Sequence, residues 1–358
     1  MKSHFIKALI ISAFVFFVNI LLSQPAKLTF APQWMPQAQF AGYYIAQEMG
    51  FYKEAGIEVE FIHPSANIPA TDLLSSGKAD VISLFLVTGM SVRTQSMDIV
   101  NICQLSQHSA IYIVAKKSSG IDKLEKLNGK KIGVWKSGFD EVPKAMMKEK
   151  KYNIEWVPIL FSVNLFMLDG IDAMTVMSYN EYNNIINCGI NEDELNVFPI
   201  SEYGYDIPED GLYCLNATYK TKREDLKKFI AATLKGWDYA AANKAAAIDI
   251  VLDRMRSAHI PANRVHQEWM LDRVLEMMMV SDNDAQIKGV QIKGVQNRGV
   301  QNRGAQNEDV QNRSFLNKRV RRGELLESDF DQTAKIINSI SEKRVSFKFD
   351  EFYKPLNR

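Results

Sequence analysis

Residues 27–61 carry a hydrophobic pattern typical of a strand, a helix and a second strand. Apolar side chains dominate 27–31, recur at helical spacing over 40–49 and alternate with acidic residues over 57–61. Gly50 and Gly56 stand where the helix and the following turn would end. The pattern predicts a βαβ start whose first strand leads into an aromatic and polar loop, and open α/β sheets bind ligands at that edge.

Predicted strands and helices continue to alternate through most of the chain. Strands are predicted over 81–86, 99–105, 110–115, 130–135 and 156–161, and helices over 68–77, 87–96, 140–150, 163–168, 223–244, 261–279 and 331–341. This alternation is typical of α/β layers on a largely parallel sheet. Residues 76–80 and 169–172 each contain glycine and aspartate, and each is followed by an apolar strand. This similarity predicts two similar lobes. The first comprises 27–115 with a C-terminal part of the chain, and the second comprises 116–220.

Residues 286–315 are six pentads that each begin with glutamine, such as Gln-Ile-Lys-Gly-Val and Gln-Asn-Arg-Gly-Val. A five-residue period fits neither a helix nor a strand, and the repeats hold few apolar side chains to bury. A stacked β-helix is the alternative, although so short a stretch gives it few turns. We expect a flexible surface insertion that divides the two-lobe domain into 24–285 and 316–358.

The N-terminus predicts a secretory signal peptide over residues 1–23. Lys2 and Lys7 precede an uncharged run over 8–22, and Ser23 follows it. This run is shorter than the roughly 20 residues that a membrane-spanning helix needs. We therefore expect a cleaved signal and an exported, periplasmic protein, with an uncleaved anchor as the alternative. The first cysteine is Cys103, so no lipobox cysteine follows the apolar run.

Composition and motifs argue against several functions. The formal net charge of +1, from 43 basic and 42 acidic residues, gives no reason to expect a nucleic-acid partner. The three cysteines match no metal-ligand or disulfide pattern, and the five histidines lie in separate contexts. The sequence has no glycine-rich phosphate loop, Gly-x-Ser-x-Gly elbow or His-Glu-x-x-His motif. We expect no metal, no cofactor and no catalytic residues.

Polar and aromatic side chains that follow predicted strands are the candidates for a small-molecule cleft. Trp34, Gln37 and Gln39 lie in the loop after the first strand, where Trp34 would either stack on a ligand or cap the core. Tyr43 and Tyr44 open the next helix, so one of them is expected to face away from the core, and Tyr43 is a candidate ligand contact. These residues would form the first wall of the cleft.

The second lobe contributes candidates from loops after its own strands. The loop of Trp135, Lys136, Ser137 and Gly138 leads into a helix, so its free amides suit a polar or anionic group, although an ordinary strand-to-helix turn is equally compatible.

The run 178–182 places a carboxylate between two phenols. We expect Asn180, Glu181 and Tyr182 in the site, because a buried glutamate needs a partner and an amino-substituted heterocycle would supply donors. A solvated glutamate at a helix N-terminus is the competing interpretation. Asp210, in a second acidic and aromatic loop, would close the cleft from the same lobe.

Seven short segments together resemble the thiamine-pyrimidine family, which contains precursor-binding proteins and eukaryotic pyrimidine synthases. The segments are Gln33-Trp-Met-Pro36, Gly42-Tyr-Tyr-Ile-Ala, Gly50-Phe-Tyr, Gly56-Ile-Glu-Val, Gly77-Lys-Ala-Asp80, Leu127-Asn-Gly-Lys-Lys-Ile-Gly133 and Tyr179-Asn-Glu-Tyr182. The resemblance covers 27–279 and 323–353. It implies the type II periplasmic-binding-protein fold, in which two α/β lobes and a hinge of two crossing strands close on a ligand in the interlobe cleft.

Two positions separate the binding proteins from the synthases in this resemblance. The synthases carry a lysine that binds pyridoxal phosphate and, four residues later, a histidine consumed as substrate, where this chain has Leu84 and Thr88. Leucine forms no Schiff base, and threonine has no imidazole to give. The resemblance therefore implies a binding protein, with Trp34 and Tyr43 or Tyr182 stacking on the ligand ring.

The function expected from these observations is capture of a thiamine pyrimidine precursor, of the formylaminopyrimidine or hydroxymethylpyrimidine type. The exported protein, expected to be a monomer, would deliver this precursor to the permease of an ABC transporter. Two alternatives stay open at this point. One is a pyrimidine synthase, and the other is a binding protein for a sulfonate or another small heterocycle.

Overall fold

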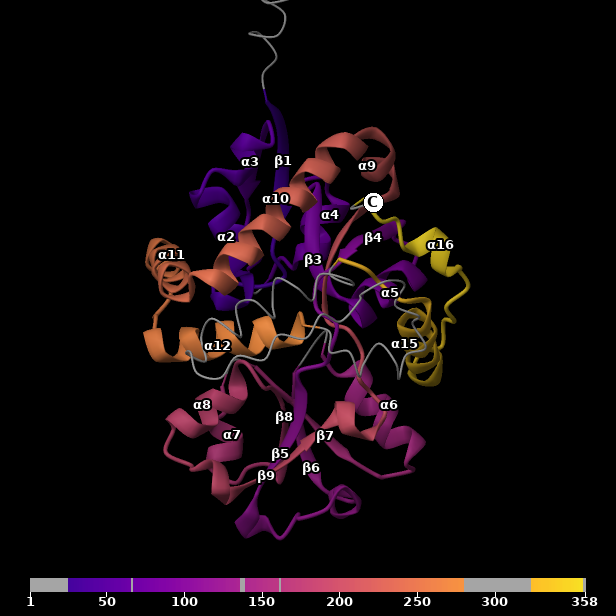
Figure 1. The fold of residues 1–358 in the computed structure, drawn as a ribbon. Coiled ribbons are helices and arrows are strands. Elements are labelled where there is room, and N and C mark those ends of the chain that lie inside the picture. The colour runs from indigo at the N-terminus through magenta and orange to yellow at the C-terminus, as the bar shows by residue number, and fades with distance from the viewer. Residues whose placement is uncertain (1–24, 66, 136–138, 161, 280–322, 357–358) are drawn as a thin grey trace, which may run out of the picture.

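The first lobe is built on a five-stranded mixed sheet with the strand order β2-β1-β3-β10-β4. The structure, a computed structural model, describes residues 25–65, 67–135, 139–160, 162–279 and 323–356 (Figure 1). β1 pairs in parallel with β2 and β3, whereas β10 runs antiparallel between β3 and β4. The strands are β1 (Ala26–Ala31), β2 (Ile57–Phe61), β3 (Val81–Phe85), β4 (Ile99–Gln104) and β10 (Asp210–Leu215).

The second lobe repeats this plan with the strand order β7-β6-β8-β5-β9. β6 pairs in parallel with β7 and β8, whereas β5 runs antiparallel to β8 and β9. The strands are β5 (Ile111–Lys116), β6 (Lys131–Trp135), β7 (Glu155–Ile159), β8 (Ala173–Met177) and β9 (Leu195–Pro199). Each sheet is therefore parallel in one part and antiparallel in the other, and the expectation of a largely parallel sheet is only partly correct.

Helices pack around both sheets (Figure 1). Those of the first lobe are η1 (Ala38–Phe40), α2 (Ala41–Glu48), α3 (Phe51–Glu54), α4 (Ala70–Ser75), α5 (Leu86–Thr94), α9 (Asn216–Thr221), α10 (Arg223–Ala242), α11 (Lys244–Ser257), α15 (Glu327–Ile340) and α16 (Phe349–Phe352). Those of the second lobe are η2 (Lys117–Ser119), η3 (Leu124–Leu127), α6 (Glu141–Glu149), α7 (Asn164–Met167), α8 (Glu181–Asn187), η4 (Glu192–Glu194) and η5 (Ile200–Tyr203). Helix α12 (Arg264–Met277) lies between the lobes (Figure 1).

The lobe boundaries expected after residue 115 and after residue 220 differ from the observed ones. β5 belongs to the second sheet because it pairs with β8 and β9, and β10 belongs to the first sheet because it pairs with β3 and β4. The chain consequently passes between the lobes twice, over 105–110 and over 205–209.

These two crossing segments are bonded to each other and form the hinge. The backbone N–H groups of Leu105 and Ser106 donate to the carbonyl oxygen of Asp210, at 3.0 and 2.9 Å. The carboxylate of Glu209 accepts from the backbone N–H of Ala110 at 2.6 Å. The hinge expected as two crossing strands is thus a pair of connecting segments that continue into β5 and β10.

Two helices from the C-terminal part of the chain contact both lobes, one on each side of the hinge in Figure 1. In α12, Gln267 accepts from the backbone N–H of Ala38 in the first lobe at 2.8 Å, and Trp269 donates to the carbonyl oxygen of Ser178 in the second at 2.9 Å. Helix α15 packs on α5 of the first lobe and on α6 of the second. The relative position of the lobes therefore depends on these two helices as well as on the hinge.

Helix α2 is buried on both faces because α10 packs tightly against it. A methyl group added at Gly42 would lie 2.2 Å from the Trp237 ring, so only glycine permits this approach. Tyr43 and Tyr44 are 2% and 1% exposed. The expectation that one of these tyrosines faces away from the core is wrong, because α10 and α11 cover the face of α2 that the sheet leaves open.

Three predicted features lie outside the described residues. They are the signal peptide over 1–23, the pentads over 286–315 and the loop over 136–138. Among the helices that the structure does describe, none combines the length and the hydropathy needed to span a membrane.

Candidate ligand-binding cleft

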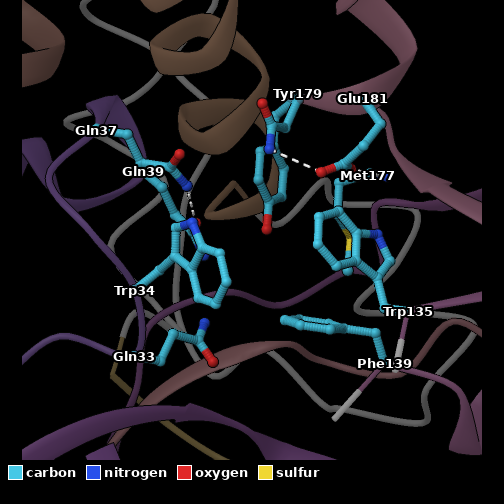
Figure 2. A pocket seen from close by; sticks show the side chains of 10 residues that line it. Gln33, Trp34, Gln37, Gln39, Trp135, Phe139, Met177, Tyr179 and Glu181 are labelled. Atoms are coloured by element: carbon cyan, nitrogen blue, oxygen red, sulfur yellow. Dashed lines mark hydrogen bonds between the residues drawn. The ribbon is translucent and has the colours of Figure 1, made fainter. Parts of the chain in front are cut away.

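A cleft lies between the lobes, and the space between its walls is about 390 Å³ with open solvent included. The part that the centre of a water molecule can reach is only about 40 Å³, so the walls lie close together. The lining residues come from the loop after β1, the end of β6, the start of α6, and the turn from β8 into α8 (Figure 2). They are Gln33, Trp34, Gln37, Gln39, Trp135, Phe139, Met177, Tyr179, Asn180 and Glu181. The cleft thus occupies the carboxyl ends of parallel strands in both lobes, as the sequence predicts.

Aromatic rings form the walls of the cavity. Trp34 of the first lobe and Trp135 of the second meet with ring centroids 6.3 Å apart and planes at 80°. Phe139 packs on Trp135 at 6.1 Å. The Tyr179 ring extends into the space between the two tryptophans (Figure 2). At this distance the two tryptophan rings are in edge-to-face contact with each other, so a flat ring enters between them only when they move apart.

The polar side of the first lobe is a chain of glutamine amides that ends on a carboxylate. Gln37 Nε2 donates to Gln39 Oε1 at 2.6 Å, and Gln39 Nε2 donates to Asp210 Oδ2 at 2.9 Å. Gln33 Nε2 donates to the other carboxylate oxygen, Asp210 Oδ1. One buried carboxylate therefore orders three side chains of the cavity-forming loop.

The polar side of the second lobe centres on Glu181, the first residue of α8, which is only 5% exposed. Its Oε2 accepts from the backbone N–H of Met177 at 2.9 Å, and its Oε1 accepts from Asn180 Nδ2 at 2.8 Å. Asn180 Oδ1 in turn lies 3.0 Å from His266 Nε2 on α12. Glu181 is thus a buried acid at a helix N-terminus, and the competing interpretation of a solvated glutamate there is wrong.

Burial raises the pKa of three carboxyl groups at the cleft and hinge towards neutrality. The pKa of Glu181 rises to about 7, against the opposing effect of its hydrogen bonds. The pKa of Glu209 rises to about 8 and that of Asp210 to about 7 for the same reason. Burial also raises the pKa of Tyr179 well above its usual value, and the three neighbouring carboxylates add to this shift.

These raised pKa values predict that stability falls as pH rises from about 6.5 to 8. A carboxyl group that is neutral when folded but ionised when unfolded binds more protons in the folded state, so the free energy of unfolding decreases with pH, by up to about 1 kcal/mol per pH unit for each group. Below pH 6.5 the lowered pKa values of His63 and His266 make the free energy of unfolding increase with pH. Urea unfolding at several pH values measures this slope, and a rising stability between pH 6.5 and 8 would contradict it. The contributing carboxyl groups are Glu141, Glu181, Glu209 and Asp210.

Five of the residues predicted for the site do line the cavity. They are Trp34, Gln39, Trp135, Asn180 and Glu181. Lys136, Ser137 and Gly138 lie outside the described residues. The cavity also includes Gln37 and Tyr179, which belong to the predicted groups around Trp34 and Glu181. Three further lining residues were not predicted: Gln33, Phe139 and Met177. Gln33 directly precedes Trp34, so its place in that polar run is the signal that would have found it.

Three predicted contacts occupy other places in the structure. Tyr43 lies in the core of the first lobe, with its ring 4.6 Å from Phe30 and 5.9 Å from Trp237. Tyr182 packs into the core of the second lobe against Tyr112 and Trp269, so Tyr179 takes the place expected for it. Asp210 lies behind the glutamines and does not line the cavity, and it comes from the first lobe rather than the second.

The family of this chain follows from a comparison with known protein families. The family model described as NMT1/THI5 like matches residues 37–247, which include most of the cleft and both hinge segments. The chain belongs to the NMT1/THI5-like family. The predicted resemblance to a thiamine-pyrimidine family is confirmed by this match and by the names of the relatives.

Two curated relatives represent different activities within the NMT1/THI5-like proteins. A 4-amino-5-hydroxymethyl-2-methylpyrimidine phosphate synthase of Aspergillus parasiticus is 24% identical over 257 residues, which is 66% of this chain and 73% of that protein. A formylaminopyrimidine-binding protein of Halalkalibacterium halodurans is 21% identical over 252 residues, which is 68% of this chain and 76% of that protein. Identity alone therefore does not separate an enzyme from a binding protein.

Solved structures confirm the predicted periplasmic-binding-protein fold. The ligand-binding component of an ABC-type import system from Staphylococcus aureus, solved with zinc bound, superposes with a TM-score of 0.57 at 11% identity, covering 93% of this chain and 98% of that one. The periplasmic aliphatic sulphonate-binding protein of Escherichia coli gives a TM-score of 0.56 at 12% identity, covering 74% and 89%. At these identities the likeness shows the shared two-lobed α/β architecture.

Proposed function

We propose that this protein is an exported binding protein that captures an amino-substituted pyrimidine of the thiamine-precursor type and delivers it to an ABC importer. The ligand ring would lie between Trp34 and Trp135, and its amino group would donate to Glu181. The N-terminal segment would direct export, and the protein would act as a monomer that presents the closed lobes to the permease. A ligand that touches both lobes favours the closed state, because it binds that state better.

The excess of hydrogen-bond acceptors in the cavity carries this proposal. Among the described lining residues there is one carboxylate, Glu181, and no lysine, arginine or histidine. A carboxylate has about four lone-pair sites, so the bonds of Glu181 to Met177, to Asn180 and to its own backbone leave accepting capacity for a ligand. An aromatic amine supplies donors to such a surface, whereas a sulfonate offers only acceptors and negative charge.

The family resemblance implies that pyrimidine synthases use a lysine and a histidine at the positions where this chain has Leu84 and Thr88. Leu84 is a buried residue of β3, and Thr88 lies in the first turn of α5. Neither side chain can bind pyridoxal phosphate as an imine or supply an imidazole. Purified protein incubated with pyridoxal phosphate is expected to show no imine absorbance, and a stoichiometric band would support the synthase instead.

A thermal-shift panel on the full chain tests the binding function against the sulfonate alternative. Saturation with 4-amino-5-hydroxymethyl-2-methylpyrimidine at 100 times Kd is expected to add about 2.7 kcal/mol, which raises Tm by about 4 °C. Alkanesulfonates at the same concentration are expected to leave Tm unchanged. Stabilisation by sulfonates without stabilisation by the aminopyrimidine would contradict the proposal.

A further inference from the structure

We propose that Asp210 sets the preference of the cleft for hydrogen-bond donors without touching the ligand, by fixing the orientation of the glutamine amides that face the cavity. This inference rests on the proposed function, because it explains how an aminopyrimidine is distinguished from a pyrimidine that carries an oxygen at the same position. Asp210 is therefore a positioning residue for specificity. Its part differs from that of Glu181, which lines the cavity itself.

The orientation of the amides follows from the chemistry of the carboxylate. An ionised carboxylate only accepts hydrogen bonds, whereas a glutamine amide has a donating nitrogen and an accepting oxygen. Asp210 accepts from Gln33 Nε2 on one oxygen and from Gln39 Nε2 on the other, so the nitrogens of both amides point to Asp210. Gln39 Oε1 is then directed to Gln37, which must donate its own nitrogen.

Two amide oxygens are left for a ligand by this arrangement. Gln33 and Gln37 both line the cavity, and each uses its Nε2 within the chain of amides. In the part of the chain that the structure describes, neither Gln33 Oε1 nor Gln37 Oε1 accepts a hydrogen bond. The first lobe consequently presents acceptors to the ligand, matching the acceptors of Glu181 on the second lobe.

The hinge holds Asp210 in the position that this role requires. Its side chain is 7% exposed, and its carbonyl oxygen accepts from the backbone of both Leu105 and Ser106. Gln104 Nε2 donates to the same carbonyl oxygen at 3.1 Å. The Gln33 backbone is fixed as well, since its N–H donates to Ser83 Oγ at 2.9 Å. Groups locked in this way keep their hydrogen-bonding direction when a ligand arrives.

The variant Asp210→Asn would invert part of this pattern. Asparagine offers one accepting oxygen and one donating nitrogen, so one glutamine must turn and direct its own nitrogen towards the cavity. The ligand pair that detects this change is 4-amino-5-hydroxymethyl-2-methylpyrimidine and its 4-oxo counterpart, whose ring nitrogen and exocyclic group exchange donor and acceptor roles. Full-chain protein at pH 8 is titrated with each ligand, and the ratio of the two Kd values is the measured quantity.

We expect Asp210→Asn to reduce the preference for the amino ligand by about 10- to 100-fold, with weaker amino binding and stronger oxo binding. Glu209→Gln is the matched control, because Glu209 is an adjacent buried carboxyl that bonds to Ala110 and Ser109 of the hinge. Its Kd ratio is expected to stay within about twofold of the wild-type ratio. Thermal unfolding of both variants confirms that they are folded.

Each of the following outcomes would contradict the inference. An unchanged Kd ratio in Asp210→Asn, or an equal loss of affinity for both ligands, would show that Asp210 has only a structural role. An equal change of the ratio in Glu209→Gln would assign the effect to the loss of any hinge carboxylate. A wild-type chain that binds neither pyrimidine would contradict the proposed function and the inference with it. If Asp210→Asn is unfolded, Asp210→Ser at the same pH replaces it, and an unchanged ratio there overturns the inference equally.

Discussion

Replacing Glu181 with glutamine is expected to weaken binding of the aminopyrimidine by about 10- to 100-fold without lowering the stability of the free protein. A hydrogen bond to a charged group contributes about 1.5–3 kcal/mol, and the glutamine amide would present a donor to a ligand that also donates. Glu181 lies at the cavity surface, and hydrogen bonds from Met177 and Asn180 fix the orientation of its carboxylate. Isothermal titration of wild type and variant at pH 8 measures the change.

Stability provides the second part of this prediction. Burial raises the pKa of Glu181 to about 7, so at pH 8 the folded state bears the cost of an ionised, desolvated carboxylate. Glutamine removes this cost, and the free energy of unfolding is expected to stay equal or rise. Glu141→Gln is the matched control: Glu141 also begins a helix of the second lobe and has a pKa raised to about 7 by burial, but it does not line the cavity.

Two results would contradict the role given to Glu181. One is an affinity within twofold of wild type in Glu181→Gln, which would place the amino group elsewhere. The other is a loss of affinity in Glu141→Gln as large as that in Glu181→Gln, which would assign the effect to a general change in the second lobe.

Replacing Trp34 with alanine is expected to weaken binding by about 10- to 100-fold, because a heterocyclic base stacked on an aromatic side chain is stabilised by about 1–3 kcal/mol. Trp34 is half-buried and meets the Trp135 ring edge to face, with the ring centroids 6.3 Å apart. Trp34→Phe keeps a ring and should retain most of the affinity. Fluorescence or calorimetric titration measures all three proteins, and unchanged binding by Trp34→Ala would exclude the stacking site between the tryptophans.

Local patterns in the sequence predict most of the strands, with β9 and β10 as exceptions, and they place the candidate cleft between the lobes. The alternating residues of β2 and the apolar runs of β3, β6 and β8 depend on neighbours along the chain, and so do the glycines that end the first helix. Loops at the carboxyl ends of β1, β6 and β8 then meet because the strands are parallel within each lobe. Trp34, Trp135 and Glu181 were accessible to prediction for this reason.

Contacts between distant segments explain the predictions that failed. Tyr43 is buried because α10, which follows it by more than 180 positions, covers the outer face of α2. Residues 209–213 resemble an acidic loop, yet 210–215 form the buried strand β10 because β3 and β4 flank it on both sides. No periodicity within these segments carries that information.

Tyr179 lines the cavity in place of the predicted Tyr182, and the cause is more local. Both phenols flank Glu181 in the sequence, but α8 begins at Glu181 itself, so the two tyrosines lie on opposite sides of the helix start. Tyr182 then turns into the core against Trp269 of α12, while Tyr179 remains in the turn that faces the cavity. A shift of one or two residues in the helix boundary, below the precision of a sequence pattern, decides which phenol reaches the ligand.

A crystal structure of the full chain with 4-amino-5-hydroxymethyl-2-methylpyrimidine tests the central claim most directly. The predicted result is a ring between Trp34 and Trp135, with its amino nitrogen within hydrogen-bond distance of a Glu181 carboxylate oxygen. A ring bound outside this cavity, or an amino group directed away from Glu181, would contradict the account.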